Sequence, residues 1–124
     1  MLETKDAVAN IAVHNLDAAR RFYEGTLGFK PVDRQGEELI VFGSGKTTFN
    51  VYRSEHAGTN RATSLTWMVD DVIKAVDELK GKGVAFEHYE IPDMKREGDV
   101  HICGDMKVAW FKDPDGNILN VVSH

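Results

Sequence analysis

The five histidines and the single cysteine are the side chains in this sequence best suited to metal binding or nucleophilic chemistry. His101 and Cys103 are two residues apart, so on an extended segment they would share a face and could form a nucleophile–base pair or a metal site. No third partner stands nearby, and no histidine pair has the H-x-x-x-H or HExxH spacing of a zinc-binding helix. We therefore favour a non-catalytic role for His101 and Cys103. We expect His14, His56 and His124 to be solvated residues at the surface.

Two other short motifs have ordinary structural interpretations. Residues 43–47 (GSGKT) resemble a phosphate-binding loop, but the G-x-x-x-x-G-K-[ST] spacing is missing and a strand pattern follows, so we interpret them as a hairpin turn. His88 and Glu90, again two residues apart, are expected to form an exposed ion pair at a strand end.

Two asparagines occupy similar strand patterns, Phe49-Asn50-Val51 and Leu119-Asn120-Val121. They are either paired amide groups that orient a ligand or residues that bond neighbouring backbone; the pattern favours neither. If the asparagines face a cavity, period-two alternation adds further polar and apolar lining residues. Trp110 would be an aromatic wall of that cavity or, as we favour, ordinary core. The candidate ligand-binding residues are Asn50, Tyr52, Ser64, Thr66, Met68, Trp110 and Asn120.

The elements that must position these residues follow one order twice: a strand, a helix and three strands. In the first half Asn15 or Asp17 precedes a stripe of apolar residues at helical spacing, and in the second half Asp70 and Asp71 do so. A glycine follows each stripe, so both stretches are expected to be helices. Asp113-Pro114-Asp115-Gly116 is a strong turn signal between the last two strands. The expected strands cover residues 7–13, 29–33, 38–42, 47–53, 64–69, 84–89, 107–112 and 117–122, and residues 90–105 are expected to form a long irregular loop.

The two halves superimpose, which predicts an internal repeat in one domain covering residues 1–124. With one constant shift, Val13 and Leu16 of the first half meet Val69 and Val72 of the second. Module one spans about residues 7–53, residues 54–63 are the polar linker, and module two spans about 64–122. Since sequence identity between the halves is low, the shared order of elements is the stronger argument.

Composition excludes several classes of function. The net charge is −5, and Lys and Arg are scattered, which argues against nucleic-acid binding. No run of about 18 apolar residues is present, and the first residues lack a secretion signal, so we expect no membrane association. A lone cysteine suits a reducing compartment, and we expect a cytoplasmic protein.

Two stretches resemble the vicinal oxygen chelate superfamily, which includes glyoxalase I, extradiol dioxygenases, fosfomycin-resistance proteins and bleomycin-binding proteins. One is Asn15-Leu16-Asp17 through Phe22-Tyr23 to Leu27-Gly28-Phe29, and the other is the segment WFKDPDGN at residues 110–117. The resemblance covers nearly the whole chain. It implies an α+β fold in which two βαβββ modules curl into an open, mixed β-sheet barrel with the helices outside, a ligand inside the curl, and often a homodimer.

The same resemblance implies a divalent metal held by four strands, but the matching positions do not supply its usual His, Glu or Gln ligands. They fall on Val8, Asn50, Ser64 and Asn120. Valine has no ligand atom, and the other three side chains are neutral, so they are weak ligands for a transition metal. We therefore expect no metal and no other cofactor, although a one-residue change in strand register would alter this set.

Three functions remain open at this point. The favoured one is a metal-free protein that binds a small molecule in the sheet cavity, as the bleomycin-binding branch does, although the sequence does not indicate bleomycin itself. The alternative is an enzyme, either metal-dependent or cofactor-free, of the lyase, isomerase or dioxygenase type. The third is an interaction module whose dimer surface matters more than its cavity.

Overall fold

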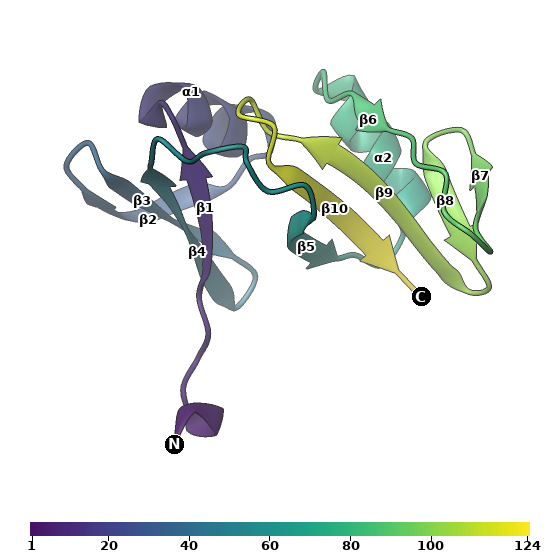
Figure 1. Cartoon of the computed structure of the whole chain (residues 1–124), viewed down its shortest axis with the longest axis horizontal. Coiled ribbons are helices and arrows are strands. Elements are labelled where there is room, and N and C mark those ends of the chain that lie inside the picture. The colour runs from purple at the N-terminus through teal and green to yellow at the C-terminus, as the bar shows by residue number, and fades with distance from the viewer.

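The computed structural model describes all 124 residues, and it contains two curled sheets that stand side by side (Figure 1). The first sheet has the strand order β1-β4-β3-β2, with β1 parallel to β4 and the other pairs antiparallel. After a short 3₁₀ turn, Leu2–Thr4, its elements are β1 (Ala9–Val13), α1 (Leu16–Arg20), the π-helical η2 (Arg21–Thr26), β2 (Lys30–Gln35), β3 (Leu39–Ser44) and β4 (Thr47–Arg53).

The second sheet repeats this plan with the order β5-β10-β9-β8-β7, and β6 pairs with one end of β9. β5 is parallel to β10, just as β1 is parallel to β4. The elements are β5 (Thr63–Met68), α2 (Val72–Gly81), β6 (Phe86–Glu87), β7 (Lys95–Glu97), β8 (Val100–Cys103), β9 (Met106–Lys112) and β10 (Ile118–Ser123). The expected α+β fold with curled sheets is confirmed, and the curl does not close into a barrel.

Two expectations for the second half were wrong. The strand expected over residues 84–89 contains only Phe86–Glu87, and the loop expected over 90–105 contains the β7–β8 hairpin, which turns at positive-φ Gly98. In the second half, both β6 and β8 pair with β9. In the first half, the corresponding strand β3 pairs on that side with β2 alone. His101 therefore lies in a strand and is 1% exposed, not in an irregular loop.

Both helices begin at the residues that the sequence indicates. The Ala18 N–H donates to Asn15 Oδ1 at 3.0 Å, and the Lys74 N–H donates to Asp71 Oδ1 at 3.1 Å, so an Asx side chain caps each helix. The first helix continues in π-helical form, and Gly28 follows it with a φ of 83°. No helix is long and apolar enough to cross a membrane.

The two halves share one apolar core on the side of the sheets that faces the helices. Aromatic rings form a continuous chain through it. In the first half Tyr23 packs against Phe49, whose ring lies 5.2 Å from that of Phe29. Phe29 stacks at 5.2 Å on Trp67 of the second half, so the seam between the sheets is packed by aromatic side chains.

A second link between the halves is the turn Asp113–Asn117, which we call the clasp turn. The Asp113 carboxylate, 5% exposed, accepts a 2.7 Å hydrogen bond from the Tyr23 hydroxyl. Burial and this carboxylate raise the pKa of Tyr23, so the phenol stays protonated and donates. Asn117 Nδ2 donates to the Ala12 carbonyl, and His14, expected to be a solvated residue, lies 2.7 Å from Asp115. The turn that the sequence predicts therefore also joins the two modules.

Candidate ligand-binding site

The strand register places the sequence-predicted candidates on the sheet faces that point away from the helices. Asn50 and Tyr52 alternate with Phe49 and Val51, which are buried against the first helix. On the second sheet Asn120 is directly opposite both Thr66 and Trp110, so these side chains share a face with Met68, and Ser64 occupies an irregularity in β5. We call this side of each sheet its open face.

The two asparagines have different surroundings, although they occupy matching strands. Asn50 is half-buried, and its Nδ2 donates to Asn10 Oδ1 at 3.1 Å, across the β1–β4 pair. Asn120 is 7% exposed, and its Oδ1 has no hydrogen-bond partner in the protein. Only Asn120 therefore keeps an unused, buried polar atom.

Trp110 is half-buried on the open face, at the centre of a cluster that the sequence does not reveal. The His101 ring lies 4.8 Å from the Trp110 ring, and the Tyr89 ring lies 5.3 Å from it, both edge to face. The Trp110 indole N–H donates to Thr63 Oγ1 at 3.0 Å, which fixes the orientation of the ring. Trp110 is thus half-buried and lies outside the main apolar core, and its role as the aromatic wall of a binding cavity stays a prediction.

Three buried polar atoms around Trp110 lack partners: Tyr89 Oη, His101 Nδ1 and Asn120 Oδ1. They are all the unpaired buried side-chain atoms in the structure, and each belongs to a residue that contacts Trp110 or pairs with it across the ladder. Such groups normally find a partner, because burying one without a hydrogen bond costs about 1–3 kcal/mol. We call Tyr89, His101, Asn120 and Trp110 the Trp110 cluster.

The tautomer of His101 follows from the hydrogen bond at its Nε2 atom. The backbone N–H of Tyr89 donates to His101 Nε2 at 3.0 Å, so Nε2 carries no proton and the neutral ring holds its proton on Nδ1. Burial lowers the pKa of His101 below its ordinary value, so the neutral form prevails at pH 7. The cluster therefore presents a donor at His101, an acceptor at Asn120 and a hydroxyl that does either at Tyr89.

The lowered pKa of His101 predicts that the domain loses stability in mild acid. Below about pH 6.5 the unfolded chain binds a proton at this position that the folded chain does not, so the free energy of unfolding falls as the pH falls. When the pH falls from 7.5 to 5.5, we expect the free energy of unfolding of His101→Gln to decrease by up to about 1 kcal/mol less than that of the original sequence. Urea titrations at both pH values measure this, and His124→Gln, an exposed site, is the control. Equal pH dependence in the two variants would contradict the prediction.

A separate hollow of about 280 Å³ lies on the open side where the two sheets meet. It brings together two of the candidates, Tyr52 and Ser64, with Asn10 and Asn60. Asn60 Nδ2 donates to Ser64 Oγ at 3.2 Å, so two of the polar groups that bound the hollow pair with each other. Ser64 lines the hollow, and its neighbour in β5, Thr63, accepts the hydrogen bond from Trp110. The hollow and the Trp110 cluster are therefore adjacent along β5.

Comparison with known proteins now decides the family. The profile of the glyoxalase/bleomycin resistance protein/dioxygenase superfamily matches residues 6–121. This chain belongs to that superfamily. A search of curated proteins found no match to the sequence.

Solved structures of superfamily members share the fold at low sequence identity. A glyoxalase family protein from Enterococcus faecalis is 17% identical, with 98% of this chain and 99% of that chain covered and a TM-score of 0.73. A bleomycin-binding protein complexed with bleomycin is 20% identical over 98% and 99%, with a TM-score of 0.72. The fosfomycin resistance protein FosX from Mesorhizobium loti is 13% identical over 98% and 92%, with a TM-score of 0.67. At these identities the likeness establishes the fold alone.

The residues of this superfamily member do not fit the metal centre that the family resemblance implies. Val8 has no ligand atom and precedes β1, and Asn50 faces Asn10 across the sheet. The amide and hydroxyl groups at the other two positions are neutral, and nowhere do three His, Cys, Asp or Glu side chains gather in a metal-binding arrangement. His101 and Cys103 do not form a site either: the first is buried on Trp110, and the second is exposed.

Sequence reasoning missed Tyr89 and His101 as members of the site. Both fall in the segment expected to be a strand end and a loop, where alternation gives no face. Met106 and Val108 do alternate with Lys107 and Ala109 in β9, and a β8 strand paired to it would have placed His101 beside Val108. His88, expected to pair with Glu90, instead lies 2.7 Å from Asp99, which also pairs with Lys80.

Proposed function

We propose that this protein binds a small organic molecule on the open face of its second sheet, at the Trp110 cluster, without a divalent metal. The observation that carries the proposal is the set of three buried polar atoms without partners around one tryptophan. A ligand that pairs with them recovers hydrogen bonding that folding leaves unmade. Binding sites of this kind combine apolar walls with a few fixed polar groups.

The donor and acceptor pattern limits the class of ligand. His101 Nδ1–H donates and Asn120 Oδ1 accepts, so an amide, a lactam or a heteroaromatic ring with adjacent acceptor and donor atoms matches both. The Trp110 ring supplies the apolar surface against which a planar ligand packs. Because the three atoms are shielded from solvent, binding requires the residues around Trp110 to move apart.

The fold relatives support a binding role of this kind. One of them is a bleomycin-binding protein complexed with bleomycin, which is a small-molecule complex on the same fold. The absence of a charged ligand set at the four metal positions supports the metal-free form of the proposal. The expected homodimer and cytoplasmic location remain part of the proposal. Val32 and Met68 are 60% and 65% exposed, so their apolar side chains are available for contact with a second copy of the chain.

A thermal-shift experiment separates this function from a metal-dependent enzyme. The purified protein is titrated with zinc, nickel, manganese and cobalt chlorides, and separately with bleomycin and a library of aromatic amides and lactams. We expect the melting temperature to rise with a library compound and not with the metals, because a ligand of the folded state stabilises it by mass action. Stoichiometric metal in the purified protein, or a metal-dependent rise, would overturn the metal-free proposal.

Removing the Tyr89 hydroxyl tests the site itself, because stability and binding are expected to change in different directions. In Tyr89→Phe the ring still packs on Trp110, and an unpaired buried oxygen disappears, so stability is retained or rises by up to about 1 kcal/mol. Affinity for the compound found in the screen is expected to fall about tenfold, which corresponds to one good hydrogen bond. Urea denaturation and calorimetric titration give the two quantities.

His124→Gln is the control, because His124 is exposed and is neither in the cluster nor among the candidate ligand-binding residues. We expect neither its stability nor its affinity to change. A Tyr89→Phe variant that is clearly destabilised and binds with unchanged affinity would show that the hydroxyl is structural, and the proposed site would fail.

A further inference from the structure

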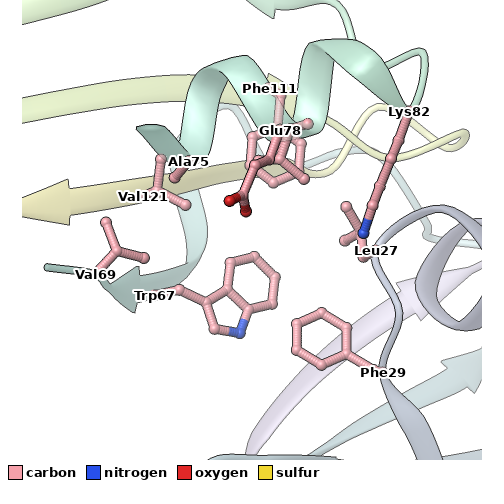
Figure 2. Close-up of a pocket in the computed structure, with 10 residues that line it drawn as sticks. Leu27, Phe29, Trp67, Val69, Ala75, Glu78, Lys82, Phe111 and Val121 are labelled. Atoms are coloured by element: carbon pink, nitrogen blue, oxygen red, sulfur yellow. The ribbon is translucent and has the colours of Figure 1, made fainter. Parts of the chain in front are cut away.

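A second cavity lies on the opposite side of the sheets, at the seam between the two modules. It has a volume of about 250 Å³, and eight of its ten lining side chains are apolar. Leu27 and Phe29 come from the first module, and Trp67, Phe111 and Val121 come from the second (Figure 2). Because side chains alternate along a strand, Phe111 and Val121 face this cavity, whereas their neighbours Trp110 and Asn120 face the open side.

Three nearly parallel aromatic rings, stacked one on the next, line the cavity. Phe29 and Trp67 stack at 5.2 Å with an angle of 20° between their planes, and Trp67 and Phe111 stack at 6.3 Å with 15°. The Trp67 indole N–H donates to Ser44 Oγ at 3.1 Å, which holds the central ring in place. Phe111 is 1% exposed, whereas Phe29 and Trp67 are half-buried, so these two rings present the aromatic surface against which one further planar ring can pack, offset or edge to face.

The mouth of the cavity carries one negative and one positive side chain, and neither forms an ion pair within the protein. Glu78 and Lys82 are four residues apart at the end of α2, and the salt bridges of the structure include neither. Figure 2 shows the Glu78 carboxylate pointing into the space beside Ala75 and the Lys82 ammonium beside Leu27. Opposite charges thus stand at two places on the rim of one apolar cavity.

We propose that this cavity is a second small-molecule site, and that it takes a small aromatic zwitterion. The ring of the ligand packs on Trp67, its ammonium group pairs with Glu78, and its carboxylate pairs with Lys82. An aromatic amino acid is the simplest molecule with this combination. The cavity volume admits one ring with a short polar arm, and the charge pair selects a ligand with both signs over one with either alone.

Four related probes test the charge pattern: L-phenylalanine, phenethylamine, phenylacetate and toluene. Binding to the full chain is measured by ligand-observed NMR and calorimetry at low salt, because exposed charge pairs are screened at high salt. We expect L-phenylalanine to bind most tightly. Glu78→Gln should weaken L-phenylalanine and phenethylamine about fivefold and leave phenylacetate unchanged, and Lys82→Gln should weaken L-phenylalanine and phenylacetate by the same factor and leave phenethylamine unchanged.

Three further variants complete the test. Ala75→Leu fills the cavity and should abolish binding of all four probes, whereas Asp77→Asn, a charge change on α2 outside the cavity, should alter none of them. Tyr89→Phe changes only the Trp110 cluster, so the affinities of the four probes for this variant should match those for the original sequence. The test of the second cavity can therefore fail or succeed independently of the test of the Trp110 cluster. Absence of binding by every probe at millimolar concentration, or equal affinities in the Gln and Asn variants, would overturn the proposal.

Discussion

Replacing Asp113 with alanine is expected to destabilise the domain by about 3–5 kcal/mol, a large part of the total stability of a protein of this size. The buried carboxylate accepts four hydrogen bonds: from the Tyr23 hydroxyl, from Asn117 Nδ2, and from the backbone N–H groups of Asp115 and Asn117. Alanine leaves all four donors without their partner, and the Tyr23 hydroxyl is fully buried, so water does not replace the lost bond.

Two milder variants show whether the effect arises from these hydrogen bonds. Asp113→Asn keeps the shape but turns an N–H₂ group toward at least one donor, so we expect an intermediate loss. Tyr23→Phe removes a single bond and should cost about 1–2 kcal/mol, because the other three donors still pair with the carboxylate. Urea denaturation followed by circular dichroism measures all three. If the alanine variant lost no more than Tyr23→Phe, the clasp turn would not be the link that we describe.

Replacing Gly58 with alanine should cost about 2–4 kcal/mol, although the residue lies in an exposed linker. Its φ is 72°, and a Cβ built there would lie 2.0 Å from the carbonyl oxygen of Asp115. The strain of a positive φ in an L-residue accounts for about 1 kcal/mol, and displacing a backbone atom of the clasp turn accounts for the rest. The cost thus reports how closely the linker approaches the clasp turn.

Gly98 provides the matched control for this substitution. Its φ is 61°, but a Cβ placed there would meet nothing within 4 Å. Gly98→Ala should therefore cost only the backbone strain, about 1 kcal/mol. Thermal denaturation of the two variants in parallel measures the difference, and equal losses would mean that the linker moves aside freely and that the close approach has no energetic weight.

The sequence predicted most of the fold, because most elements are specified by local chemistry. Asn15 and Asp71 are side-chain caps next to apolar stripes, and Asp113 to Gly116 is a turn under almost any tertiary arrangement. The β7–β8 hairpin could not be predicted in this way. Its first strand is Lys-Arg-Glu, which is exposed and has no apolar alternation, so only its pairing with β8 makes it a strand.

The candidate site was predicted in part for the same reason. Trp110 and Asn120 lie on strands with clear alternation, so their common face followed from the pattern once the register was right. Tyr89 and His101 join them through tertiary contacts alone. The Tyr89 N–H reaches His101 across twelve residues, and local sequence rules say nothing about such a distance. The unpaired state of the three polar atoms likewise depends on every neighbour at once and has no signature in the sequence.

The aromatic chain that crosses the seam makes the folding of each module depend on the other. The two modules share the same order of elements, yet neither half contains a complete interior: Phe29 packs on Trp67, and Tyr23 bonds to Asp113. Fragments 1–57 and 58–124, expressed separately, should each remain unstructured and recover native circular dichroism only when mixed. Each module therefore supplies part of the other's interior, and neither is an independent folding unit.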